Sequence, residues 1–338
     1  MAGGAQQTRN RQTGFVAMQH ILLSFIENAM TVAVITHSHC TLHDNGTPHH
    51  PESADRLGAI NNRMIMSGVD WIARHYDSHC AEREHLTRVH DEDYIDRVYA
   101  TSPTEGFALL DGDTGMNPHS LDAALHGAGA VIMAVDLVMA GTHKHAFCAI
   151  RPPGHHAGRN VAAGFCIFNN VAVGAAHAME VYGIERIAII DFDVHHGDGT
   201  EAIFKNEPRV MFFSSFQHPF YPFSGADTNL PNIKNLPMPS GTGGAAWREA
   251  IEAQWLPAMR EFKPELVMIS AGFDSHAEDD MGGFNLLERD YVWITRELCQ
   301  IAKEFADGRV VSCLEGGYEL SPLARSATMH IKELAEFH

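Results

Sequence analysis

The sequence alternates short apolar runs with amphipathic stretches, and this alternation is the feature that most restricts its fold. The runs are rich in β-branched residues, and several are apolar on both faces, as buried parallel strands are. They are TVAVIT (31–36), HAFCAI (145–150), RIAIID (186–191), RVMFFS (209–214), ELVMIS (265–270) and RVVSCL (309–314). Helical patterns at 120–141, 245–262 and 289–306 lie between them. The sequence therefore predicts an α/β fold with three αβα layers and a central, mostly parallel sheet.

The chain is expected to form one domain. Its 338 residues are 45% hydrophobic, which is enough to bury a sizeable core, and no repeat or low-complexity linker divides residues 30–338. Residues 1–29 are expected to be a poorly ordered tail. Polar residues interrupt their apolar stretch, and no small-residue cleavage motif follows, so a signal peptide is disfavoured. No run approaches the roughly 18 apolar residues of a membrane span.

The charge and the cysteines narrow the class of protein. With 24 basic and 42 acidic residues, the formal net charge is −18, which argues against nucleic-acid binding. An acidic surface suits a cationic substrate, although solubility or a salty habitat would also explain it. The six cysteines include no CxxC pair, so we expect reduced thiols and a cytoplasmic location.

Polar loops follow most of the expected strands. They are RPPGHH, FDVHHGDGT, SFQHPFYP, AGFDSH and EGGY. Ligands of open parallel sheets bind outside the carboxyl ends of the strands, so these loops are expected to converge on one site. The stiff turn RPPGHHAG (151–158) brings two adjacent imidazoles, His155 and His156, to that site.

The densest polar cluster, DFDVHHGD (191–198), indicates a metal site. Asp193 and His195 alternate just past a strand, so both side chains can point the same way. Asp274, in AGFDSH, is the best third ligand. Three protein ligands leave one position open, as in a catalytic zinc site. The plainer interpretation is that these residues only cap helices or bind water at loop ends.

A second histidine-rich stretch is a weaker metal candidate. HSHCTLHD offers four donors, with two more histidines nearby: His37, His39, Cys40, His43, His49 and His50. The spacing does not match the usual zinc modules. Because the chain has 23 histidines, crowding by chance explains the stretch equally well.

The motifs RPPGHHA, GFCIFNN, DFDVHHGDGT, SAGFDSH and EGGY, in this order, resemble the zinc-dependent histone deacetylase family. The match is closest to class II-like and bacterial members, which include acetylpolyamine amidohydrolases. HHPESADRL (49–57) and RVHDEDYI (88–95) also fit, and the resemblance runs from about residue 31 to 325. It implies the arginase-deacetylase fold and one zinc ion on Asp193, His195 and Asp274.

The resemblance also implies roles for individual residues. His156 would serve as general base and acid, His155 as its charged partner, and Tyr318 as the donor to the oxyanion. The carboxylates behind the two histidines would be Asp191 and Asp198, respectively. A potassium site is implied at Ser214 and Ser215 with Asp191, Asp193 and His195.

The substrate is expected to be an acetylated amine, either an acetylpolyamine or an acetyllysine side chain, with polyamines favoured. The resemblance implies channel walls at Gly164, Phe165 and Tyr221, which suit a methylene chain. Met281 and Asp111 are expected at the rim, Asp111 together with Asp113. The acidic run Glu278, Asp279 and Asp280 would either attract ammonium groups or simply be a solvated turn.

Three alternative functions stay open. The first is a protein or histone-lysine deacetylase. The second is a binuclear manganese ureohydrolase, which shares the fold but needs more bridging aspartates than DVHHGD and GFDSHAEDD supply. The third is a non-catalytic acyl-lysine binder. Related amidohydrolases can dimerise, and the sequence leaves a homodimer open.

Overall fold

The computed structural model describes residues 31–336, and the expected tail at 1–29 lies outside that range. Within it, eight parallel strands form one sheet in the order β2-β1-β5-β10-β9-β6-β7-β8. The strands are β1 (Val32–Thr36), β2 (Ala73–Asp77), β5 (His145–Cys148), β6 (Ile187–Asp191), β7 (Val210–Gln217), β8 (Ile233–Met238), β9 (Leu266–Ala271) and β10 (Val310–Leu314). A small antiparallel pair, β3 (Ala108–Leu109) and β4 (Gly115–Met116), stands apart.

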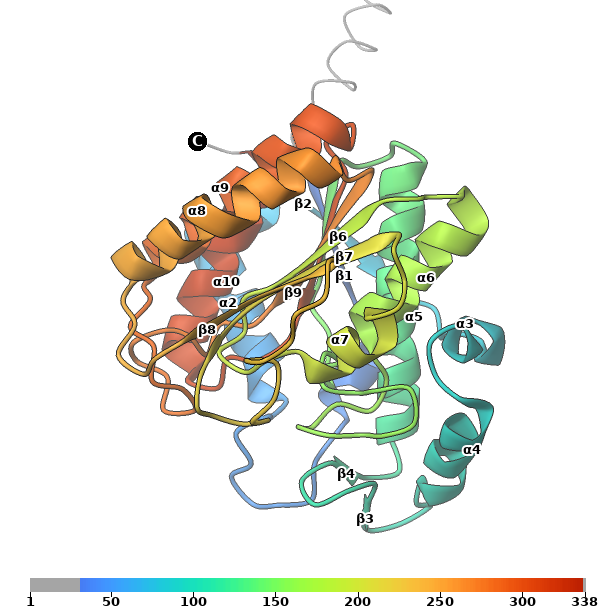
Figure 1. Ribbon diagram of the computed structural model, residues 1–338. Helices are drawn as coiled ribbons and strands as arrows, with labels where there is room; N and C mark the ends of the chain where they lie inside the picture. The colour runs from blue at the N-terminus through green and yellow to red at the C-terminus, as the bar shows by residue number, and fades with distance from the viewer. Residues whose placement is uncertain (1–30, 337–338) are drawn as a thin grey trace, which may run out of the picture.

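Helices cover both faces of the sheet (Figure 1). One layer holds α2 (Asp55–Ser67), α8 (Gly244–Phe262), α9 (Glu288–Phe305) and α10 (Leu320–Leu334). The other holds α5 (Ser120–Met139), α6 (Asn170–Tyr182) and α7 (Asp198–Phe204), with α3 (Arg83–Thr87) and α4 (Glu92–Thr101) outside them. Two short 3₁₀ turns, η1 (Ser38–Thr41) and η2 (Val69–Ile72), follow β1 and α2. The predicted three-layer architecture is confirmed.

All six predicted strands are present, and every residue of β6, β9 and β10 is buried. Strands covered by helices on both faces have no solvent side, which explains their continuous apolar sequence. The helix α5 is long and apolar enough to suit a membrane span, and 72% of its most apolar window is buried inside the protein. The six cysteines are all free.

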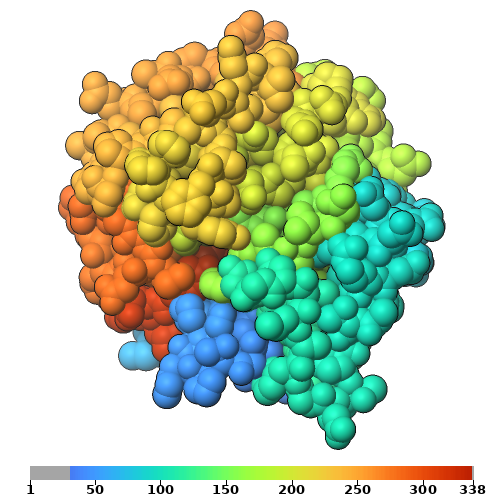
Figure 2. Space-filling model, turned by 60° about the horizontal axis from the view of Figure 1, so that its bottom comes forward, coloured from blue at the N-terminus to red at the C-terminus, as the bar shows by residue number. Residues whose placement is uncertain are grey.

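The strands run so that their carboxyl ends meet at the lower edge of the sheet in Figure 1. Long loops gather at this edge. In Figure 2, which turns the same edge toward the viewer, segments of several colours meet around a hollow near the middle of the face. The loops after β5, β6, β7, β9 and β10 therefore converge, as the sequence predicted.

Candidate active site

The proposed metal ligands come from two adjacent strands. β6 and β9 pair in parallel, with Asp191 opposite Ser270. Asp193 lies just beyond the end of β6, and Asp274 just beyond the end of β9. The pairing of the strands therefore brings together side chains that are about 80 residues apart in sequence.

Asp193, His195 and Asp274 form a compact, buried donor cluster. Their donor atoms all lie within 4.8 Å of one another. His195 Nδ1 lies 3.0 Å from Asp193 Oδ1 and 3.2 Å from Asp274 Oδ2. The backbone fixes the carboxylates, since Gly316 N donates to Asp193 Oδ2 (2.8 Å) and Val194 N donates to Asp274 Oδ1 (2.8 Å). Two carboxylates and one imidazole with restrained orientation are a donor set that suits zinc.

The electrostatics of the cluster also favour a cation. Burial and the charge of Asp193 raise the pKa of Asp274 to about 7. Burial alone would lower the pKa of His195, but hydrogen bonds to Asp193 and Asp274 raise it to about 10. Burial alone would raise the pKa of Asp193, but the charges of His155 and His195 lower it, so Asp193 stays ionised. In the absence of an ion the protons of the cluster are therefore on His195 and partly on Asp274, and a divalent ion at the same position would displace them.

The tandem histidines lie beside this cluster, each with its own carboxylate. His155 Nδ1 lies 2.9 Å from Asp191 Oδ2, and its Nε2 lies 3.8 Å from Asp193 Oδ2. His156 Nδ1 lies 2.7 Å from Asp198 Oδ1. A carboxylate on Nδ1 fixes the proton there, so that Nε2 of His156 is left as the basic nitrogen at the cavity.

The two imidazoles differ in protonation. Burial alone would lower the pKa of His155, but the charges of Asp191 and Asp193 outweigh it and raise the pKa well above its ordinary value. Burial and the neighbouring charge of His155 lower the pKa of His156 to about 4. His155 is therefore a fixed cation, whereas His156 is neutral near pH 7 and able to accept a proton.

A buried carboxylate holds the turn that carries both histidines. Glu315 Oε2 accepts hydrogen bonds from the amides of Gly154 (2.7 Å) and His155 (3.1 Å). Its Oε1 accepts one from Ser270 Oγ (3.0 Å). Glu315 is the first residue after β10, so the central strand directly positions the turn after β5.

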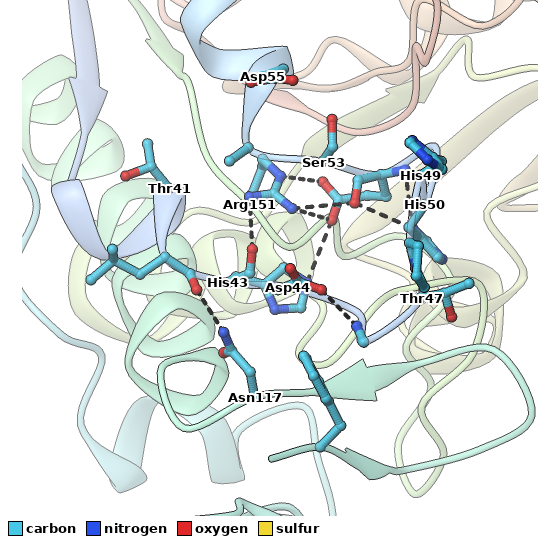
Figure 3. Close-up of a pocket in the computed structure, with 16 residues that line it drawn as sticks. Thr41, His43, Asp44, Thr47, His49, His50, Ser53, Asp55, Asn117 and Arg151 are labelled. Carbon is cyan, nitrogen blue, oxygen red and sulfur yellow. Dashed lines mark hydrogen bonds and ion pairs between the residues drawn. The ribbon is translucent and has the colours of Figure 1, made fainter. Parts of the chain in front are cut away.

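A buried ion-pair network supports the start of the same turn (Figure 3). Arg151 binds the Glu52 carboxylate through Nε (2.5 Å) and Nη2 (2.7 Å), and its Nη1 donates to the carbonyl of Cys40 (2.9 Å). Glu52 also accepts from Arg56 (3.0 Å), whose Nε donates to Gly317 O (2.6 Å). Burial would raise the pKa of Glu52, but Arg151 holds it well below its ordinary range. The network joins the loop at 41–55 to the catalytic turn and to the loop after β10.

A cavity of about 260 Å³ opens onto these groups. It is lined by Asp113, His156, Gly164, Phe165, His195, Phe220, Tyr221, Asp280, Met281 and Tyr318. The Phe165 and Tyr318 ring centroids are 6.1 Å apart, and those of His156 and Tyr221 are 5.2 Å apart. Burial and the charges of Asp193 and Asp274 raise the pKa of Tyr318 well above its ordinary value, so its hydroxyl stays a donor. The cavity is therefore an aromatic slot that reaches the imidazole of His156, a base, and the hydroxyl of Tyr318, a hydrogen-bond donor.

Gly164 lets the channel wall approach the base closely. Its φ is +53°, and a Cβ built there would lie 2.3 Å from His156 Cδ2. Only glycine adopts this backbone without strain and leaves room for the ring. The wall therefore limits where the imidazole of His156 can rotate.

The two carboxylates expected on the rim loop, Asp111 and Asp113, have different surroundings. Its Oδ1 accepts hydrogen bonds from the amides of Asp113 (3.0 Å) and Thr114 (2.7 Å) and so closes its own loop. Asp111 is absent from the cavity lining, where Asp113 stands instead and accepts from Gly164 N (3.1 Å). Of the two carboxylates expected on this loop, Asp113 is therefore the one that lines the cavity, and a substrate contact at Asp111 stays a prediction.

The acidic run after Asp274 is divided among three tasks. Glu278 pairs with Arg325 (2.6 Å). Asp279 is buried and accepts hydrogen bonds from the amides of Tyr318 (2.7 Å) and Glu319 (3.0 Å). These bonds orient the backbone just before α10. Asp280 is the exposed carboxylate of the run that lines the cavity.

The expected potassium ligands Ser214 and Ser215 are buried within β7, beside the end of β6. Asp191 is the register partner of Ser214. Ser214 Oγ lies 2.9 Å from His196 Nδ1, and Ser215 Oγ accepts from Trp247 Nε1 (3.0 Å). Both hydroxyl oxygens keep a lone pair beyond these bonds.

Sequence reasoning missed several residues that hold the site. Phe220 stacks on His195 at 5.3 Å between centroids, and Glu52, Arg151 and Glu315 position the catalytic turn. Arg151 and Glu315 stand within the quoted motifs RPPGHH and EGGY, and Glu52 stands within HHPESADRL. Charged residues inside an apolar, proline- and glycine-rich context were the available signal, since such residues are buried only when paired.

Comparisons with known proteins agree with this geometry. The sequence matches the histone deacetylase domain family over residues 50–334. It is 37% identical to the uncharacterized protein slr0245 of Synechocystis, over 90% of this chain and 99% of that protein. It is 36% identical to a "Probable deacetylase" of Archaeoglobus fulgidus (86% and 82%) and to human polyamine deacetylase HDAC10 (84% and 44%). The crystal structure of the HDA15 HD domain superposes with a TM-score of 0.85 at 32% identity, over 90% of each chain.

Proposed function

Because this chain belongs to the histone deacetylase family and is a hydrolytic deacetylase, we propose that it removes acetyl groups from amines by using one zinc ion. Asp193, His195 and Asp274 would hold the ion. The observation that carries the proposal is the buried cluster of these donors within 4.8 Å, beside two histidines that each bind a separate carboxylate. When bound there, zinc would polarise the amide carbonyl and lower the pKa of a water molecule.

The protein supplies the proton transfers. His156 is neutral, and Asp198 fixes its Nδ1 proton, so Nε2 accepts a proton from the attacking water and later returns it to the leaving amine. His155, charged by Asp191 and Asp193, stabilises the negative charge that develops nearby. The Tyr318 hydroxyl donates to the developing oxyanion, and one such donor contributes about 3–4 kcal/mol.

The cavity favours an acetylated primary amine on a methylene chain. Phe165, Phe220 and Tyr221 provide apolar faces for the chain. Asp113 and Asp280 place two carboxylates along the lining, where a second cationic group of the substrate would be attracted. Acetylpolyamines and acetyllysine side chains both have this form, and polyamines add the remote ammonium groups.

We also propose a potassium ion where the end of β6 lies beside Ser214 and Ser215 of β7. The support is the position of Asp191 opposite Ser214, with Ser215 beside it and every one of these groups buried. The ion would neutralise part of the negative charge beneath the zinc ligands. Replacement of K⁺ by choline in the assay buffer should then lower turnover.

The binuclear ureohydrolase is disfavoured by the partners of the neighbouring carboxylates. A second metal would need free bridging carboxylates beside the first set. Asp191 instead binds His155 (2.9 Å), and Asp198 binds His156 (2.7 Å). Both carboxylates are already used to orient imidazoles.

The decisive experiment is a specificity panel with N-acetylputrescine, N⁸-acetylspermidine and an acetyllysine peptide, run on the zinc-loaded enzyme. Tyr318→Phe should lower kcat at least about 100-fold on every substrate that is turned over. Asp280→Asn should raise KM for the polyamines, whereas the matched variant Glu278→Gln, whose carboxylate pairs with Arg325, should not. No turnover of any substrate with zinc bound would favour the acyl-lysine binder instead.

A further inference from the structure

A second group of metal-ligand side chains lies away from the active site. His37, His39 and His126 each offer a nitrogen, and these atoms all lie within 4.8 Å of one another. The cluster differs from the one expected in HSHCTLHD, because it recruits a helix residue from far along the chain. Cys40 is buried as a free thiol, and His43 turns inward to Ser120 Oγ (2.7 Å).

The fold explains why the three histidines meet. His37 follows the end of β1 and caps η1, which contains His39. His126 lies nearly two turns into α5, which starts at Ser120 and packs against η1. β5 and β10 separate β1 from β9, the strand that precedes Asp274. The histidine cluster is therefore distinct from the zinc ligands.

Hydrogen bonds leave ring nitrogens available at the cluster. His126 Nδ1 lies 3.0 Å from the carbonyl oxygen of Ser78 and 3.1 Å from its hydroxyl. A carbonyl can only accept, so the proton of His126 is on Nδ1 and its Nε2 keeps a lone pair. In metal sites the ring nitrogen that does not bind the ion commonly donates to a carbonyl in the same way, and this bond orients the ring. His39 Nδ1 is buried and has no hydrogen-bond partner among the described residues. His37 Nδ1 accepts only a long bond from His39 N (3.3 Å).

The geometry is close to that of a metal site but requires one adjustment. Zinc–nitrogen bonds of about 2.0–2.1 Å in a tetrahedral site place the nitrogens about 3.4 Å apart. The rings of His37 and His126 are stacked, with centroids 3.5 Å apart and planes 3° apart. Parallel rings cannot direct both in-plane lone pairs at one ion, so the His37 ring must tilt. The His37 ring is half-buried, so it has room to tilt, and the tilt would exchange its stacking on His126 and its 3.3 Å bond from His39 N for a bond to the ion.

We propose that His37, His39 and His126 form a second metal site, which takes a late first-row divalent ion such as Zn²⁺, Ni²⁺ or Cu²⁺. Imidazole ligands select these metals, and the half-exposed side of the cluster leaves room for water as a further ligand. The ion fixes η1 against α5. Because Arg151 binds the carbonyl of Cys40 in η1, the ion also stiffens the support of the catalytic turn.

The test counts metal ions on the tag-free, full-length chain. After equilibrium dialysis against micromolar Zn²⁺, inductively coupled plasma mass spectrometry should find two equivalents in the wild type. The variant His37→Ala/His126→Ala should lose one equivalent, and Asp274→Asn should lose the other. His119→Ala, an exposed histidine at the start of α5, is the matched control and should keep both.

Two further measurements locate the second ion and check that the variants are folded. An anomalous difference map at the zinc edge should show a peak among the three rings, and circular dichroism checks that each variant is folded. Should the double variant be misfolded, His37→Ala alone replaces it, since that side chain is half-buried. A single equivalent in the wild type, or a second equivalent that survives in the folded variant, overturns the site. A site that forms while deacetylation is absent would contradict the proposed function only.

Discussion

Gly316→Ala is expected to disable the metal site although it replaces none of the proposed ligands. Gly316 N donates to Asp193 Oδ2 (2.8 Å), so its backbone lies against the ligands. A Cβ at this position would lie 2.2 Å from Asp274 Oδ2 and 2.5 Å from Asp193 Oδ2. A comfortable carbon–oxygen contact is about 3.3 Å or more, so the nearer oxygen would have to move by about 1 Å.

The size of the loss follows from that displacement. Metal sites tolerate only about ±0.2 Å in ligand distance, and even changes to groups behind the ligands cost about 10–100-fold in affinity. We therefore expect zinc affinity to fall at least about 100-fold, which corresponds to about 2.8 kcal/mol. Turnover at limiting zinc should fall in proportion.

The assay is competition for zinc against a fluorescent chelator, followed by deacetylase turnover on the same samples. Gly58→Ala is the matched control, because a Cβ there meets nothing within 4 Å. It replaces a glycine in the interior of α2 and should leave zinc affinity unchanged. Wild-type zinc affinity in folded Gly316→Ala would show that Asp193 and Asp274 do not hold the ion together.

Three further predictions concern the base, the acid stability and the metal. Asp198→Asn removes the negative charge beside His156 Nδ1 and should lower kcat about 10–100-fold while zinc content is unchanged; a rate within twofold of the wild type would contradict it. Burial lowers the pKa of His330 to about 3 from an ordinary 6.5, so the unfolded chain binds a proton more readily. The contribution of neutral His330 to the free energy of unfolding is therefore fully present above pH 6.5. It is lost as the pH falls toward 3, by up to about 1.4 kcal/mol per pH unit. Urea unfolding over this range should show a shallower pH slope for His330→Gln, and equal slopes would refute the assignment. Removal of metal with dipicolinate should abolish deacetylation, and added Zn²⁺ should restore it; turnover that persists without metal would be inconsistent with the proposed mechanism.

The central strands were predictable and the edge strands were not. β6, β9 and β10 are buried on both faces, so their sequences are continuously apolar. β2 reads ARHYD and is mostly exposed, while β8 reads IKNLPM and includes Pro237. An edge strand has only one neighbour and needs no apolar run, and proline is tolerated there. Their sequences therefore carry little signal of strand structure.

The donors of the site were predictable because they follow strand ends, but their exact surroundings were not. Asp111 and Asp113 are separated by one residue, and only local hydrogen bonding decides that Asp113 lines the cavity. His126 joins His37 through packing of α5 on η1, which no spacing in the sequence encodes. Residues that touch through tertiary packing alone need the fold before they can be assigned.

The position of β10 has a consequence for how this protein is made. The last strand among residues 31–336, β10, lies in the middle of the sheet, between β5 and β9. Until it is synthesised, the nascent chain must keep a slot open, with two apolar strand edges that can pair with other polypeptides. We therefore expect the core to stay incomplete until β10 has emerged, and chaperone demand during synthesis to be high until then.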